Sequence, residues 1–113
     1  MKVTVFDYGA GNLHSLLKAI AGDGRRVDVE SDPARAVSTD VLVLPGVGAF
    51  GHAAARLAPG RDALRAALGA GLPCLGICLG MQLLFDASDE GAGLGLGVLR
   101  GRVRRLEGGR VPQ

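Results

Sequence analysis

A cysteine between two glycines is the feature of this sequence that could most directly do chemistry. Cys78 stands two residues after Gly76 and two before Gly80. The apolar run over residues 72–77 has the length of a strand, and the apolar residues after Cys78 recur at helical spacing, so a buried strand is predicted to turn into a helix there. A thiol at a helix N-terminus is favoured as the thiolate, which attacks carbonyl carbon. Cys78 is therefore a candidate nucleophile.

The two flanking glycines indicate how such a turn could form. In a nucleophile elbow the central residue adopts a strained backbone geometry, and the strand and helix pass too closely for side chains at the flanking positions. The same five residues also fit a buried structural cysteine between two packing glycines. The rest of the chain has to decide between these interpretations.

The other cysteine, Cys74, lies four positions before Cys78. This spacing fits neither a zinc knuckle nor a Cys-x-x-Cys redox pair, and no further cysteine could form a disulfide framework. A reducing, cytoplasmic setting is expected, and no metal or cofactor is predicted. The sequence shows no charged-then-apolar leader and no apolar run of membrane-spanning length, so we expect a soluble protein that is not exported.

Composition limits the remaining possibilities. The chain has 113 residues, 48% of them hydrophobic, with no Trp, so we expect one domain whose core is built from Ala, Val and Leu, as in parallel α/β sheets. The net charge of +2 is small. An arginine-rich run over residues 100–110 lacks interleaved aromatics, and we interpret it as a strand with a solvated basic face rather than a phosphate-binding patch. Nucleic acid is not indicated as a partner.

The elements that must position Cys78 alternate between strand and helix. Strands are predicted near residues 2, 27, 41, 72 and 98, with helices between the first four and another after Cys78. This order predicts an α/β fold with a mostly parallel open sheet and helices on both faces. Glycine-rich loops at 7–12 and 45–51 then lie at the same edge as Cys78. The first loop lacks the third glycine of a dinucleotide-binding fingerprint.

Three separated motifs together resemble the class I, triad-type glutamine amidotransferases, and within them the glutaminase subunits of imidazole glycerol phosphate synthase. The motifs are Tyr8-Gly-Ala-Gly-Asn12, Leu44-Pro-Gly-Val-Gly-Ala-Phe50 and Gly76-Ile-Cys-Leu-Gly-Met-Gln-Leu-Leu84. The resemblance implies a flavodoxin-like amidotransferase fold, of which residues 1–113 would be the N-terminal portion of a single domain. It also implies hydrolysis of glutamine to glutamate, with ammonia passing to a (β/α)8-barrel cyclase partner in a heterodimer of histidine biosynthesis.

The resemblance implies a role for several positions. Cys78 corresponds to the nucleophile that forms a glutamyl thioester. The backbone N–H of Leu79, directly after the nucleophile, is placed to donate to the oxyanion, and the Val47–Gly48 loop resembles the source of the second donor. The substrate-binding positions implied in the same way are Gly46, Gly48, Leu79 and Gln82.

The sequence departs from the family in its general base. The family uses a His with a Glu two residues later, near the C-terminus of a longer chain, and no His-x-Glu occurs here. His14 and His52 are interpreted as surface residues. A cysteine nucleophile without its base lacks the proton acceptor, so we expect a C-terminally truncated copy that is weak or inactive alone.

Two alternatives remain open at this stage. One is an amidotransferase domain of another pathway, or another cysteine hydrolase with the same elbow. The other is a non-catalytic regulatory module that uses Cys78 as a redox-sensitive thiol.

Overall fold

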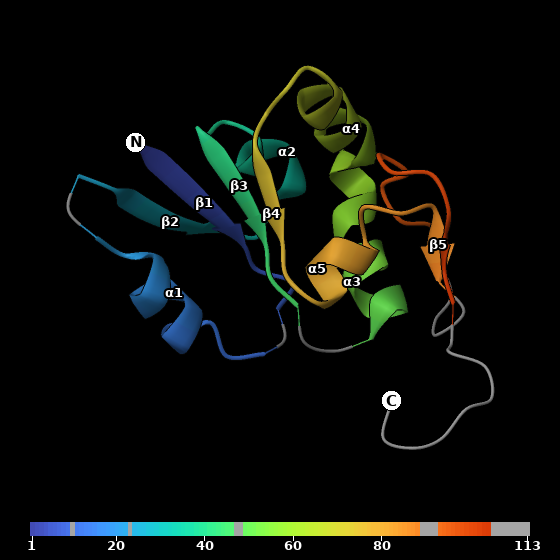
Figure 1. Cartoon of the computed structure of the whole chain (residues 1–113), viewed down its shortest axis with the longest axis horizontal. Coiled ribbons are helices and arrows are strands. Elements are labelled where there is room, and N and C mark those ends of the chain that lie inside the picture. The colour runs from blue at the N-terminus through green and yellow to red at the C-terminus, as the bar shows by residue number, and fades with distance from the viewer. Residues whose placement is uncertain (10, 23, 47–48, 89–92, 105–113) are drawn as a thin grey trace.

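Four parallel strands form the central sheet of the chain (Figure 1). A computed structural model describes residues 1–9, 11–22, 24–46, 49–88 and 93–104. The strands are β1 (Lys2–Phe6), β2 (Arg26–Glu30), β3 (Val41–Leu44) and β4 (Cys74–Gly76), and their spatial order is β2-β1-β3-β4. This is the flavodoxin-like doubly wound order, so the predicted α/β class is confirmed.

Helices cover both faces of this sheet, as predicted. Helix α1 (His14–Ile20) packs against one face, where the side chains of Val3, Val5 and Val43 form a buried cluster. The other face is covered by α2 (Pro33–Ala36), α3 (Phe50–Leu57) and α4 (Arg61–Gly69). Successive strand residues point to opposite faces, so a strand of continuous apolar residues can supply both cores.

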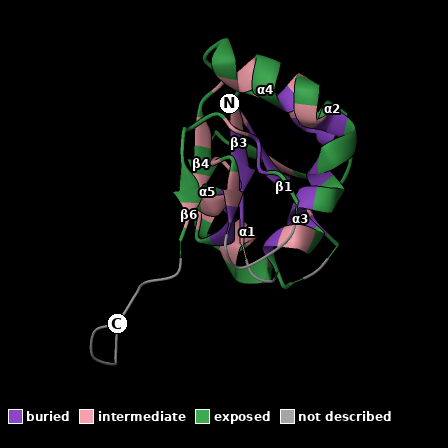
Figure 2. Cartoon of the chain, turned by 90° about the vertical axis from the view of Figure 1, so that its right-hand side faces the viewer, coloured by how far each residue is buried: buried purple, intermediate pink, exposed green. Residues whose placement is uncertain are grey.

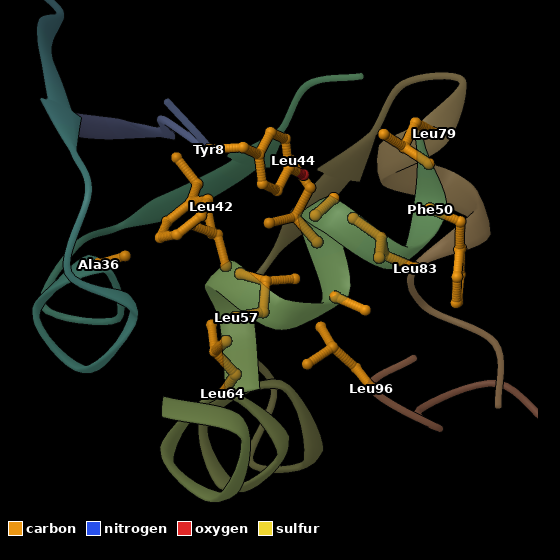
Figure 3. Close-up of a cluster of buried hydrophobic side chains, with 13 residues drawn as sticks. Tyr8, Ala36, Leu42, Leu44, Phe50, Leu57, Leu64, Leu79, Leu83 and Leu96 are labelled. Carbon is orange, nitrogen blue, oxygen red and sulfur yellow. The ribbon is translucent and has the colours of Figure 1, made fainter. Parts of the chain in front are cut away.

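The larger core lies under α3 and α4 (Figure 3). Leu42 and Leu44 of β3 meet Leu57 of α3 and Leu64 of α4, and all four side chains are fully buried or nearly so. Each such leucine contributes about 1.5–3 kcal/mol by leaving water. The core therefore fixes β3, the strand beside the one that leads to Cys78.

Helix boundaries follow local signals in the sequence. Helix α2 begins with Pro33 at its first position, and the Asp32 side chain accepts a hydrogen bond from the Ala34 N–H at 3.0 Å. A short 3-10 turn, η1 (Ala58–Gly60), separates α3 from α4 at Pro59 and Gly60. No helix in the described part of the chain is long and apolar enough to cross a membrane.

The strand that leads to Cys78 differs from its prediction as a buried strand over residues 72–77. Strand β4 spans three residues, and the Leu75 side chain at its centre is 52% exposed. The reason is its place in the sheet: within the described residues, β4 is the last strand of the order and pairs with β3 alone. The predicted apolar strand is therefore present but short, and one of its two edges is not paired within the described residues.

The predicted fifth strand of the sheet, near residues 98–106, is wrong within the described residues. Only β6 (Arg102–Val103) is extended there, and it pairs in parallel with β5 (Ala87–Ser88) as a separate two-stranded sheet; residues 105 and 106 lie outside the described residues. The reason for this difference lies in the residues that precede Arg102. Leu96 is buried in the core and its N–H donates to the Leu83 carbonyl at 2.7 Å, which holds this segment beside the helix that follows Cys78.

Candidate active site

Cys78 occupies a strained turn between β4 and α5 (Leu79–Gln82). Its backbone angles are φ 50° and ψ −112°, and among the described residues no other non-glycine residue has a positive φ. Such a conformation costs about 1–3 kcal/mol and persists only when its surroundings hold it. Two hydrogen bonds do so: the Ile77 N–H donates to the Leu44 carbonyl at 3.0 Å, and the Gln82 N–H donates to the Cys78 carbonyl at 3.1 Å.

The glycines on either side of Cys78 are required by backbone contacts. A Cβ atom on Gly80 would overlap the carbonyl oxygen of Leu44, and one on Gly76 would stand 2.8 Å from the Cα atom of Met81. Helix α5 thus begins in direct contact with the backbone of β3. The geometry predicted for a nucleophile elbow is present, and it leaves the Cys78 residue exposed to solvent.

The loop after β3 lies over the first turn of α5. A Cβ atom on Gly46 would stand 2.5 Å from the backbone nitrogen of Leu79. Leu79 is buried, and within the part of the chain that the structure describes its N–H has no hydrogen-bond acceptor. Val47 and Gly48, predicted to supply the second oxyanion donor, lie outside the described residues. The structure therefore brings Gly46, Leu79 and Cys78 together.

Both glycine-rich loops meet beside the elbow, as predicted. A cavity of about 170 Å³ is lined by Tyr8 and Asn12 of the first loop, by Pro45 and Gly46 of the second, and by Ile77, which precedes Cys78; Leu16 of α1 also lines it. Gln82, the remaining predicted substrate contact, is half-buried one helical turn after Cys78.

The two histidines lie on helices, and neither takes part in the hydrogen bonds described above for the elbow. His14 is exposed on α1, and His52 is exposed on α3 with its Nε2 atom 3.2 Å from the Tyr8 carbonyl oxygen. In the described structure neither histidine is hydrogen-bonded to Cys78. Nor does any group of three or more His, Cys, Asp or Glu side chains in those residues form a possible metal site.

The two cysteines differ in their surroundings. Cys74 is partly buried in the core, and burial raises the pKa of its thiol to about 11. Cys78 is exposed. Because the thiolate is the attacking form, Cys74 is a poor nucleophile at neutral pH, and Cys78 is the better placed of the two.

One contributor to the site was missed by reasoning from side-chain types. The Leu44 carbonyl oxygen accepts a hydrogen bond from Ile77 and lies against Gly80, so it ties both sides of the elbow to β3. A main-chain carbonyl carries no residue-type signal. The glycine at position 80 is the sequence feature that could have indicated a close backbone neighbour.

A flavodoxin-like sheet with a cysteine at a strained strand-to-helix turn defines an α/β protein of the nucleophile-elbow class. The chain belongs to the class I glutamine amidotransferase family, whose family model matches residues 4–109. The resemblance inferred from the three motifs is thereby confirmed.

Several curated relatives are similar over nearly the whole chain. The imidazole glycerol phosphate synthase subunit HisH of Thermus thermophilus is 46% identical over 100% of this chain and 59% of its own length. Subunits of the same name are 51% identical in Symbiobacterium thermophilum, over 96% of this chain and 52% of the relative, and 43% identical in Pyrococcus furiosus, over 98% and 55%. The chain therefore spans somewhat more than half the length of these relatives.

Proposed function

We propose that this chain is the nucleophile-bearing part of a glutaminase that serves imidazole glycerol phosphate synthase in histidine biosynthesis. Residues 1–113 would form the N-terminal portion of a single amidotransferase domain. The name that the relatives share, a synthase subunit, supports the pathway and the existence of a second subunit. The elbow at Cys78 supports the chemistry.

The proposed reaction begins at the Cys78 sulfur. The thiolate attacks the side-chain amide carbon of glutamine, and the carbonyl oxygen becomes an oxyanion as the S–C bond forms. Collapse of this intermediate breaks the C–N bond, and ammonia leaves after the nitrogen has been protonated. Water then attacks the glutamyl thioester, so that glutamate is released and the thiol is restored.

The oxyanion needs donors that are already in position. The Leu79 N–H follows the nucleophile directly and has no acceptor among the described residues. A preorganised donor of this kind is worth about 2.7–4 kcal/mol of transition-state stabilisation. In this proposal Val47 and Gly48 supply the second donor, while Gly46 and Gln82 contact the glutamine.

Two parts of the proposed machinery lie outside this sequence. A His-Glu pair would take the thiol proton and later protonate the leaving ammonia, and no His-x-Glu occurs among the 113 residues. The ammonia would be consumed by a cyclase subunit with a (β/α)8 barrel. The 113-residue chain is therefore expected to acylate Cys78 slowly and to turn over poorly.

The observation that carries this proposal is the solvent-exposed residue Cys78 at a positive-φ turn. Its test is labelling with a glutamine-analogue electrophile, mapped by mass spectrometry. We expect modification of Cys78 before Cys74, and none at residue 78 in a Cys78→Ser variant, with Cys74→Ser as the matched control. Preferred labelling of Cys74 would exclude the elbow as the nucleophilic site.

A second measurement addresses the missing base. Glutamate release is measured for the chain alone and with a cyclase subunit, beside a relative of full length. A rate equal to that of the full-length relative would show that the reaction does not need the absent His-Glu pair.

A further inference from the structure

The turn that follows α5 is held by a second segment of the chain, residues 95–99, which we call the capping segment. Four successive carbonyls after α5 each accept a hydrogen bond from an N–H of this segment at 2.7–3.2 Å: the donors are Leu96 to Leu83, Leu99 to Leu84, Gly97 to Phe85 and Gly95 to Asp86. Backbone carbonyls that leave water need such partners. The capping segment therefore fixes the backbone of residues 83–86.

Only one short helix separates these carbonyls from Cys78. Helix α5 spans four residues, and its hydrogen bonds join the two ends directly: the Gln82 N–H donates to the Cys78 carbonyl at 3.1 Å, and the Leu83 N–H donates to the Leu79 carbonyl at 3.0 Å. Leu79 and Leu83 are both buried in the larger core. In a closely packed core, a shift of residues 83–86 would also shift α5 and the backbone at the elbow.

Arg61, the first residue of α4, ties the capping segment to the helical layer. Its Nε atom donates a hydrogen bond to the Gly95 carbonyl at 3.0 Å. The N–H of the same glycine donates to the Asp86 carbonyl at 2.8 Å, so Gly95 connects Arg61 to the end of the turn after α5. A terminal nitrogen of the guanidinium also lies near Gly97, at 3.7 Å from the place that a Cβ atom would take there.

The position of Arg61 is electrostatically unfavourable for α4 itself. The first turn of a helix carries a partial positive charge and favours acidic side chains; Asp62 fits this preference and Arg61 does not. Figure 2 shows α4 mainly in the colours of exposed and intermediate residues, and Leu64 is its buried residue. Arg61 is partly buried, whereas Arg65, one turn later, is exposed. The bond to Gly95 accounts for an arginine at this place better than the helix does.

We propose that Arg61 is a positioning residue for Cys78. By holding the Gly95 carbonyl it keeps the capping segment on residues 83–86, and these residues keep α5 and the elbow in place. The inference rests on the proposed function only in taking Cys78 as the nucleophile. Arg61 acts through the capping segment and takes no part in the chemical step.

The first test is amide hydrogen exchange in the Arg61→Met variant, which keeps an apolar stem and removes the donors. We expect the amide protons of the capping segment to exchange at least about tenfold faster than in the parent. The Ala70 N–H, bonded to the Ala66 carbonyl at the end of α4, is the internal control and should be unchanged. Arg65→Met, on the same helix, is the matched control variant.

The second test compares two electrophiles at Cys78. Iodoacetamide needs only an accessible thiol, and its rate should stay within about twofold of the parent in both variants. A glutamine-analogue electrophile also needs the elbow and the Leu79 N–H in their places. We expect Arg61→Met to react with it at least about fivefold more slowly, because small misplacements of reacting groups are costly, and Arg65→Met to react at the parent rate.

Three results would overturn the proposal. Unchanged exchange of the capping segment in Arg61→Met, or exchange that rises equally at the Ala70 N–H, would show that Arg61 does not hold this segment locally. Faster exchange with an unchanged rate for the glutamine analogue would show that the segment does not position Cys78. Equal effects on both electrophiles, or in both variants, would make the role a general structural one.

Failure of the proposed function would be seen in the parent chain, before any variant is compared. The glutamine analogue would then leave Cys78 of the parent unlabelled. In that case the hydrogen-exchange result alone would decide whether Arg61 holds the capping segment on the turn after α5.

Discussion

The Cα atom of Gly46 lies so close to the start of α5 that a Cβ atom there would stand 2.5 Å from the backbone nitrogen of Leu79. Real Cβ atoms do not approach a backbone nitrogen at this distance, so one of the two segments has to move if the glycine is replaced. A shift of the loop after β3 would therefore also displace the backbone of Leu79, the proposed oxyanion donor.

Replacing Gly46 with alanine should destabilise the chain and disturb the elbow. We expect a loss of about 1–3 kcal/mol in the free energy of unfolding, because the overpacked contact is between two backbones and no flexible side chain can give way. Labelling of Cys78 should slow at the same time. Gly69→Ala is the control, since Gly69 lies at the end of α4 with nothing within 4 Å of its would-be Cβ. Equal unfolding midpoints for the two variants would contradict the packing account.

The two leucines of the Gly93–Gly97 segment should respond very differently to truncation. Leu96 is 1% exposed and Leu94 is 65% exposed. Leu96→Ala should cost about 2–5 kcal/mol of folding stability through the lost burial and the cavity it leaves. Leu94→Ala should change it by less than about 0.5 kcal/mol. Denaturant titration measures both, and a small effect at Leu96 would mean that this segment does not belong to the core.

Removing the hydroxyl of Tyr8 should leave stability unchanged or raise it. The Tyr8 ring packs edge-to-face on Phe6 with centroids 5.0 Å apart, and the hydroxyl is buried with no hydrogen-bond partner among the described residues. Tyr8→Phe keeps the ring pair and removes a buried polar atom whose desolvation costs about 1–3 kcal/mol. Tyr8→Leu, which removes the ring pair, is the comparison and should be less stable. A marked loss in Tyr8→Phe would reveal a partner for the hydroxyl.

Stability should fall at alkaline pH because of Cys74. Burial raises the pKa of this thiol from its ordinary value of 9.0 to about 11, so the unfolded chain releases the proton at a lower pH than the folded chain. The resulting contribution to stability is fully present below pH 9 and is lost as the pH rises through about 11. We expect the unfolding midpoint of the parent to fall more steeply over this window than that of Cys74→Ala. Parallel curves would contradict the raised pKa.

The elements that sequence reasoning predicted well are those with local signals. The change of period at Cys78, with glycines two residues away on each side, indicates the elbow without knowledge of the rest of the fold. The continuous apolar run of β3 likewise indicates a strand buried on both faces. In both cases the sequence signal lies within the segment itself, although the contacts that hold the segment include distant residues such as Leu44.

The elements that were mispredicted depend on distant contacts. The run around Leu75 has the composition of a central strand, and only the sheet order reveals that it lies at an edge. The segment near Arg102 reads as a fifth strand, but burial of Leu96 and its hydrogen bond to Leu83 direct it elsewhere. The approach of Gly46 to Leu79 could not be predicted from the sequence for the same reason. A glycine allows a close backbone contact, but the sequence does not indicate which residue makes it.

Because of the positive φ of Cys78, stability and the proposed chemistry favour different residues at position 78. Glycine adopts such a conformation freely, so Cys78→Gly would relax the turn while deleting the sulfur. A laboratory selection for thermal tolerance alone would therefore favour loss of the thiol, whereas selection for the proposed glutamine hydrolysis would retain it. Efforts to engineer a hardier variant should hold position 78 fixed and seek their gains elsewhere.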